Sequence, residues 1–575
     1  MYLRKLRRKS STGDAREYWA LVESYRTERG PRQRVVAHLG EAEESERDGI
    51  AALASGTTAS QCGLFEEHAP QWVEVDSRRV RVERARRFGD VWLALELMRK
   101  LRFPELLADV LPSPRAKIPW ADLAMILVVA RFCGVESELS IAERFYASTA
   151  LSDLLGIAPA DVYENRLYRA LDVLVAHKDV VQQRIKERFG DLFAIEYDIL
   201  LYDVTSTYFE GAAMANPDAR RGYSRDGRSD CKQVTVGLVV TREGIPLGYE
   251  MFEGNRHDSK TVDEIVRKME TLYGTSNRIW VMDRGMVSAA NHVLLQSGRR
   301  YIIGTPKSML RKFEHQMLDQ QWEQVHAGLE VKRCASPEGT DEVFILCRSS
   351  ARREKEHAMH ELFRRRIEEG LERIREQCAK RRVKDVGVVE RRIGRLMQKN
   401  MRAAAMFTVS TREEDGRVIV AWTMNETSTE WARLSEGYYM LRSNIQDWTG
   451  EELWKAYIQL TEAEAAFRVH KDDLHLRPIW HQKSARVNAH IMVCYLAYVL
   501  WKCFGQMCKQ AGLGNEPRKI IEEIKQLTLM DVILPTKSGV DLRLRCVGKP
   551  DTPLAILLQK LHLHPPDRLE TRMQL

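Results

Sequence analysis

The stretch Asp198-Ile-Leu-Leu-Tyr-Asp203 opens the part of the chain whose pattern decides the fold. It is a short apolar run that ends in an acid, as is typical of a buried strand. Further strands are predicted at 233–241, 245–254, 278–283 and 299–306, and amphipathic helices at 259–274 and 285–298. This order of elements predicts an α/β fold with a mixed sheet and helices packed on it.

Two of these predicted strands end in an acid, Asp203 and Asp283. A carboxylate at the end of a buried strand is held rigidly at the rim of the sheet, which suits a metal ligand. Taken alone, either residue is more simply a turn or cap residue. If the two strands are neighbours, however, their carboxylates converge on one place.

A third acid lies in a predicted continuous helix from Tyr457 to Lys471, which lacks Gly and Pro. Steps of seven residues place Tyr457, Glu464 and Lys471 on one stripe of this helix, whereas Glu462 lies about 200° around it and points elsewhere. A lone helical Glu is usually solvated. A helix that returns across the sheet could nevertheless bring Glu464 to the two strand acids.

The composition of this trio favours a hard cation. Three carboxylates without Cys or His are typical of Mg²⁺ or Mn²⁺ sites and disfavour zinc. Two such ions can activate a nucleophile and stabilise a leaving oxygen in phosphoryl transfer. The acids therefore indicate a metal-dependent reaction at a phosphate.

Charge elsewhere fits a polyanionic partner. The chain of 575 residues has a formal net charge of +8, and it is long enough for three or four domains. Residues 1–40 hold ten Lys or Arg against four acids, and 352–402 hold seventeen against nine. Either run alone is more simply a solvated face. The longest apolar stretch, 491–501, is far shorter than the roughly 20 residues of a membrane span, so a buried helix in a cytoplasmic protein without membrane contact is predicted.

Five motifs carry a resemblance to a known family. They are LYDVTSTYFEG (201–211), GYSRDGRSDCKQ (222–233), GNRHD (254–258), VMDRGMVS (281–288) and YIQLTEAEAAFRVHKDDLHLRPIWH (457–481). In this order the segment from about 198 to 500 resembles the DDE transposases of bacterial insertion sequences. The similarity is to the branch whose third acid lies in a Tyr/Arg/Glu/Lys helix after a large insertion.

The resemblance implies an RNase H-like catalytic domain in which Asp203, Asp283 and Glu464 bind two divalent ions, Mg²⁺ or Mn²⁺. It implies cleavage of double-stranded DNA at the terminal inverted repeats of the element. The freed 3′-hydroxyl would then attack target DNA. Because two element ends must be joined, a homodimer is expected.

The resemblance also implies DNA contacts near the cut by Tyr457 and Lys471. The family's Arg position is occupied here by Leu460, and Arg468, one turn past Glu464, is a candidate substitute.

Other candidates rest on their place in the sequence. Arg284 directly follows Asp283 and is a candidate phosphate contact. Lys232 lies with Arg225 in a polar loop that either contacts DNA or is simply solvated. His257 and Asp258 suggest a metal pair or, more simply, a helix cap with Asp258 near the N-cap.

The predicted organisation has six parts. They are 1–89, a basic β-hairpin and linker; 90–195, a mainly helical region that is either a helix-turn-helix DNA reader or an ordinary bundle; 196–305, the first part of the catalytic domain; 306–449, a large insertion domain of charged helices and strands; 450–512, the second part of the catalytic domain; and 513–575, a C-terminal region with a hairpin.

Three functions remain open at this point. The leading one is a transposase that cleaves and joins DNA. The alternatives are a catalytically silent DNA-binding repressor of transposition and a related nuclease without strand transfer. The terminal repeat, the target site and the excision route are not encoded in these motifs.

Overall fold

A computed structural model describes residues 2–9, 15–27, 30–40, 73–113, 118–135, 137–193, 195, 197–274, 278–380, 382–383, 385–414, 416–537 and 539–569. Contacts divide the chain into two compact units. The first contains Ala15–Arg300 and Ile458–Leu575, and the second contains Tyr301–Tyr457.

The first unit is built on a mixed sheet in the strand order β8-β5-β6-β7. Strand β5 pairs antiparallel with β6 and parallel with β8, and β6 pairs antiparallel with β7. The predicted mixed α/β sheet is therefore confirmed. The strands are β5 (Ile199–Tyr208), β6 (Gln233–Thr241), β7 (Pro246–Glu253) and β8 (Ile279–Met282).

One strand is longer than the sequence predicts. Asp203 was expected to end its strand, but β5 continues to Tyr208, so Asp203 lies in the middle of β5. The residues after it are β-branched, small or aromatic and pair with β6, from Val204 opposite Gly237 to Tyr208 opposite Gln233. The sheet thus holds the backbone on both sides of this acid.

Helices cover the sheet as predicted for an α/β fold. The predicted helices at 259–274 and 285–298 are confirmed as α10 (Val262–Tyr273) and α11 (Ala289–Gln296). Helix α18 (Thr461–Asp472) packs against β5 and β6, and α9 (Lys178–Phe193) and α19 (Ser484–Gln510) pack against β7.

The predicted continuous helix from Tyr457 to Lys471 is wrong. Helix α17 (Gly450–Ile458) ends before α18 begins at Thr461. The Thr461 hydroxyl donates to the Ile458 carbonyl over 2.8 Å, and this side-chain bond competes with continuation of the helix. Leu460 is the buried N-cap of α18, and its carbonyl accepts from the backbone N–H of Glu464 over 3.3 Å.

Helix α19 is the central helix of this unit. It is long and apolar enough to pass a length and hydropathy test for a membrane span, but 72% of its apolar window is buried inside the protein. This confirms the predicted buried helix. Helices of the N-terminal half pack around it, namely α2 (Gly89–Lys100), α4 (Trp120–Phe132) and α8 (Glu164–Ala176). Shorter helices pack against these surrounding helices or against each other, namely α3 (Phe103–Val110), α5 (Glu138–Ser140), a π-helix (Ile141–Phe145), α6 (Tyr146–Ser148) and α7 (Leu151–Leu155).

Two smaller sheets complete the first unit. The predicted N-terminal hairpin is confirmed as β2 (Ala15–Thr27) and β3 (Gly30–Gly40), with an unpredicted third strand, β1 (Tyr2–Lys9). The predicted C-terminal hairpin is likewise confirmed. It joins distant strands in a sheet of β18 (Arg568–Leu569), β17 (Asp541–Val547), β16 (Thr528–Pro535) and β4 (Arg81–Arg87).

The second unit contains five strands that lie in the order β10-β11-β12-β15-β9. Its strands are β9 (Arg300–Gly304), β10 (Glu323–His326), β11 (Leu329–Ala335), β12 (Val343–Ser349) and β15 (Tyr438–Ser443).

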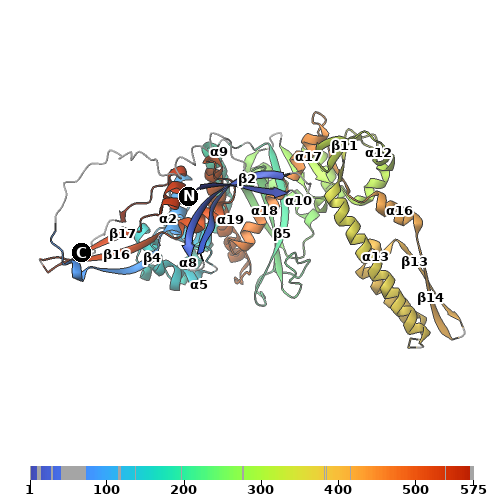
Figure 1. The fold of residues 1–575 in the computed structure, drawn as a ribbon, viewed down its shortest axis with the longest axis horizontal. Coiled ribbons are helices and arrows are strands. Elements are labelled where there is room, and N and C mark those ends of the chain that lie inside the picture. Colours follow the sequence, from blue (N-terminus) through green and yellow to red (C-terminus); the bar gives the residue numbers. More distant parts are fainter. Residues whose placement is uncertain are drawn as a thin grey trace. The chain divides into compact units, whose positions relative to one another are not determined.

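Between β12 and β15 the second unit carries what we call the arm, residues 350–434. The 30-residue helix α13 runs beside the hairpin β13–β14, and a small core of its own joins them (Figure 1). The arm consists of α13 (Ser350–Ala379), α14 (Val386–Lys399), α15 (Met401–Ala404), β13 (Phe407–Glu414), β14 (Arg417–Met424) and α16 (Glu426–Leu434).

Candidate active site

The register of the first sheet brings two acids together. Strands β5 and β8 run parallel with Tyr202 opposite Met282, and the next residues are Asp203 and Asp283. Both acids line one cavity of about 330 Å³, and Glu464 of α18 lines the same cavity. The structure therefore places all three candidate acids at one site, although 181 residues of sequence separate Asp283 from Glu464.

The packing of α18 on β5 and β6 explains the position of Glu464. As expected, Glu462 points elsewhere, with its Oε2 3.5 Å from the Lys502 Nζ on α19. The two glutamates of one helix thus have different surroundings, one in the acid cavity and one beside a lysine.

The cavity is electrostatically suited to a cation. Burial, together with the nearby Glu464 and Asp283 carboxylates, raises the pKa of Asp203 to about 6. The Val204 backbone N–H and the Arg225 guanidinium act in the opposite direction. A site that holds several carboxylates against each other gains from a divalent ion.

The donor set also fits Mg²⁺ or Mn²⁺. Among the described residues that line the cavity there is no Cys or His, and a fourth carboxylate, Asp258, is present. Oxygen ligands of this kind are those preferred by hard cations.

For Asp258 the sequence suggested either a metal pair with His257 or, more simply, a helix cap. It was expected near an N-cap, but His257 is the N-cap of the short helix Asp258–Lys260, with its ring accepting from the Ser259 N–H. Asp258 instead lies on the cavity wall, where its Oδ2 accepts from Arg225 Nη2 over 2.5 Å. The available signal was the motif GNRHD itself, in which Asp258 follows the end of β7 by five residues.

The loop that carries Arg225 is fixed to the helix of Glu464. Lys471 of α18 donates to Asp226 Oδ1 over 2.8 Å, and Arg477 forms a second ion pair with the same oxygen. The Asp226 side chain is 4% exposed and that of Lys471 10%. Burial lowers the pKa of Lys471, while Asp226 raises it. This clamp is the contact that the structure gives to Lys471.

The remaining candidate DNA-contacting residues differ in exposure and in the element that carries them. Arg284 and Arg468 are exposed. Lys232 is half-buried, and its Nζ donates to the Ala213 carbonyl over 3.3 Å. Tyr457 lies in α17, so it is not on the helix that carries Glu464.

The sequence was compared with models of known protein families. A family model described as the transposase DDE domain matches residues 195–500, more than half of the chain. The chain belongs to the DDE transposases. A second model, the N-terminal domain of the IS1634 family of transposases, matches residues 3–63. No curated protein sequence matches the chain. The resemblance drawn from the motifs is thus confirmed: this is an insertion-sequence transposase, of a family that acts on DNA, and DDE transposase domains use divalent metal ions.

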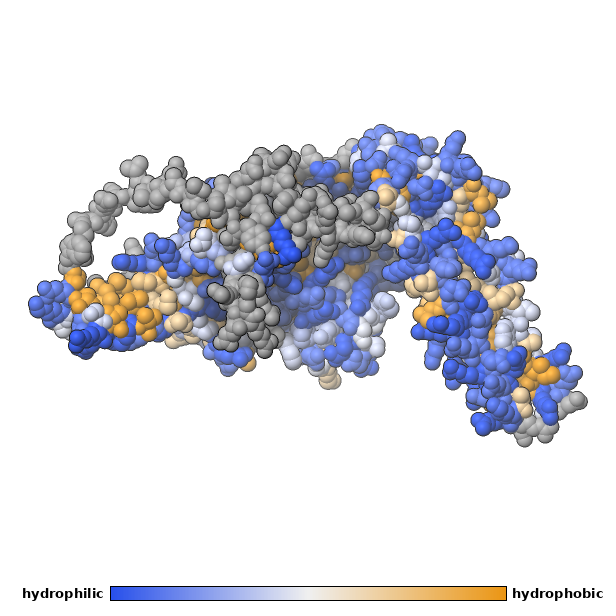
Figure 2. Space-filling view, in the orientation of Figure 1, coloured by the Kyte–Doolittle hydropathy of each residue, from blue (hydrophilic) through white to orange (hydrophobic). Residues whose placement is uncertain are grey.

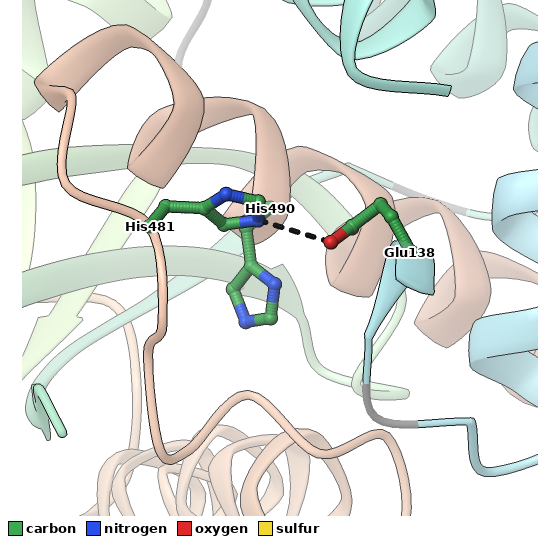
Figure 3. A group of neighbouring side chains, drawn as sticks. All are labelled: Glu138, His481 and His490. Carbon is green, nitrogen blue, oxygen red and sulfur yellow. Dashed lines mark ion pairs between the residues drawn. The ribbon is translucent and has the colours of Figure 1, made fainter. Parts of the chain in front are cut away.

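The transposase has a second cluster of potential ligands, Glu138, His481 and His490 (Figure 3). Their ligand atoms lie within 4.8 Å of one another, and Glu138 Oε2 is 3.4 Å from His481 Nε2. However, Arg131 Nη2 lies 3.3 Å from His490 Nδ1 and 3.9 Å from Glu138 Oε1. A buried guanidinium already supplies the positive charge, which disfavours a metal ion there.

This cluster behaves as an internal charge network. Burial opposes ionisation of Glu138, but the His481 hydrogen bond and the charges of His481 and Arg131 lower its pKa to about 2. Burial and Arg131 lower the pKa of His490 well below its usual value, so this ring is neutral. The network ties α5 to the segment between α18 and α19.

Proposed function

We propose that the transposase cleaves DNA at the ends of its element and joins the freed 3′-hydroxyls to target DNA. In this proposal Asp203, Asp283 and Glu464 are the catalytic residues and hold two Mg²⁺ or Mn²⁺ ions. The observation that carries the proposal is the convergence of the three acids on one oxygen-lined cavity. Bound divalent ions would activate the attacking oxygen and stabilise the leaving oxygen.

The protein's own residues organise this chemistry. The sheet fixes Asp203 and Asp283 on adjacent strands, and α18 delivers Glu464. Arg225, held by Asp258, is the one cation among the described residues that line the cavity. It is positioned to balance the carboxylates before the metal ions and the DNA phosphate bind.

We further propose that Arg284, Arg468, Lys232, Tyr457 and Lys471 contact DNA. The exposed guanidiniums of Arg284 and Arg468 are the best placed to meet phosphates, since Arg284 directly follows Asp283 and Arg468 lies one helical turn past Glu464. For Lys471 a DNA contact would be added to the ion pair with Asp226. Joining two element ends requires two active sites, which supports a homodimer. The proposed location is the bacterial cytoplasm, on DNA.

The test uses labelled element-end DNA, Mg²⁺ and the full-length protein. Wild type is compared with Asp203→Ala and Glu464→Ala, and Glu462→Ala is the matched control on the same helix. We expect cleaved and joined products with wild type and with Glu462→Ala only. Cleavage without joining would support a nuclease, and binding without cleavage by every variant would support a silent repressor.

A further inference from the structure

The outer face of α14 collects positive charge. Between Val386 and Lys399 the helix has four basic residues and one acid, Glu390. Its inner face is apolar, with Val389 and Ile393 buried in the core of the arm. At about 100° per residue, the basic residues cover an arc of about 100° on the side opposite Ile393. Folding of the arm therefore does not require them.

On the neighbouring helix α13, most charged side chains form ion pairs within the helix. It has eight basic residues and seven acids. Most of its described arginines pair with a glutamate three or four positions away, as in Arg352–Glu356, Arg364–Glu368, Arg373–Glu369 and Arg375–Glu372. Such a helix is nearly neutral and self-compensated.

On α14, by contrast, Arg391, Arg395 and Lys399 are exposed and have no acidic partner within ion-pair distance among the described residues. They follow each other at i, i+4 and i+8, so like charges repel along one stripe. Glu390 cannot relieve this, because it lies toward the hairpin, where its Oε1 accepts from Thr411 Oγ1 over 2.9 Å. The stripe is thus an uncompensated charge on an exposed surface.

We infer that this stripe, which we call the α14 basic face (Arg391, Arg395 and Lys399), binds the phosphate backbone of duplex DNA. Its charges are spaced by about 6 Å and span about 12 Å along the helix. One DNA strand presents a phosphate about every 3.4 Å along the duplex axis, so three or four phosphates lie within this length. The surface along the arm is mostly hydrophilic (Figure 2), which fits a polar partner. The inference rests on the proposed function in that the substrate is DNA.

Two consequences follow for the contact. Binding to phosphates is independent of base sequence, so the face would hold flanking or target DNA rather than read the terminal repeat. It would also be strongly salt-dependent, because each neutralised phosphate releases condensed counterions.

The test measures affinity for a linear duplex of unrelated sequence at a series of NaCl concentrations. EDTA is present, so that DNA cleavage does not affect the measured affinity. The variant is Arg391→Gln/Arg395→Gln/Lys399→Gln in the full-length protein, since Gln is a good helix former at exposed positions. We expect the slope of log K against log [NaCl] to become shallower by about 2.7, which corresponds to three lost phosphate contacts.

Two controls make the result specific. Arg373→Gln/Arg375→Gln/Lys380→Gln removes the same formal charge from paired residues of α13 and its C-cap and should leave the slope nearly unchanged. Arg391→Lys/Arg395→Lys keeps the charge and should keep the slope.

An unchanged slope in the α14 variant, or an equal loss in the α13 control, would overturn the inference. Either result would leave the proposed function intact if cleavage of element ends persists. Conversely, a protein that does not cleave DNA but shows the predicted slopes would contradict the proposed function alone.

Discussion

The acid cavity and the cluster around Glu138 are both sites where acids meet inside the first unit, but they differ in how charge is balanced. Around Glu138, the Arg131 guanidinium and the His481 ring compensate the carboxylate. In the cavity, four carboxylates face one guanidinium, that of Arg225. The charges around Glu138 pair with each other and stabilise the fold. The carboxylates of the cavity lack enough positive charge within the protein, and we expect a bound cation to supply it. The α14 basic face is the positive counterpart of the cavity.

The largest expected effect comes from the uncompensated acids. Glu464→Gln keeps the size of the side chain but removes a charged ligand, and we expect DNA cleavage to fall by about 10³-fold or more, with little change in stability. Single-turnover cleavage measures this effect. Glu462→Gln on the same helix should stay within a few-fold of wild type, and equal losses in both variants would contradict the assignment.

Loss of a compensated ion pair should instead lower the stability of the fold. Asp226→Asn leaves the Lys471 and Arg477 cations facing each other, and we expect a loss of about 3 kcal/mol in the free energy of unfolding. Urea unfolding measures it. The matched control is Asp230→Asn in the same loop, where the side chain is 67% exposed, and it should leave the free energy of unfolding nearly unchanged.

The Glu138 cluster should give a smaller, pH-dependent effect. Because the folded pKa of Glu138 is lowered from 4.5 to about 2, its ionisation stabilises the protein above pH 4.5, and this contribution is lost as the pH falls toward 2. We expect Glu138→Gln to cost about 2 kcal/mol near neutral pH and progressively less in acid. Urea unfolding between pH 7 and pH 3 checks this. A cost that is constant with pH would show that the charge is not what stabilises the cluster.

The smallest effect is expected on α14, where removal of repulsion should stabilise the fold. Arg395→Glu replaces two like-charge contacts, with Arg391 and Lys399, by attractive ones, which is worth about 1 kcal/mol at most. The same variant should weaken DNA binding. Thermal melts and DNA titrations test the two effects, and Arg395→Gln should give an intermediate gain. Destabilisation by Arg395→Glu would mean that this face contributes to the fold.

Features carried by local pattern were predictable from the sequence. The strands and helices around Asp203 and Asp283 follow from apolar periodicity, and the motifs gave the family. Helix propensity did not predict the break before α18, where the Thr461 hydroxyl donates to the Ile458 carbonyl.

Long-range partners left no local signal. Lys471 donates to Asp226, which lies 245 residues away in the sequence. Arg86 in β4 donates to Asp531 in β16, which lies 445 residues away. The amino-acid composition shows that these charged residues are present, but it does not show which of them form ion pairs. The role of each charge depends on whether the fold supplies a counter-charge, and periodicity does not encode that.

In the proposed active site, Asp203, Asp283 and Glu464 together hold divalent ions. Titration of Mn²⁺ into the protein bound to element-end DNA, followed by electron paramagnetic resonance of the free ion, tests it most directly. Wild type and Glu462→Gln should bind two ions per active site, whereas Asp203→Asn should lose at least one. Equal Mn²⁺ binding by wild type and Asp203→Asn would contradict the account.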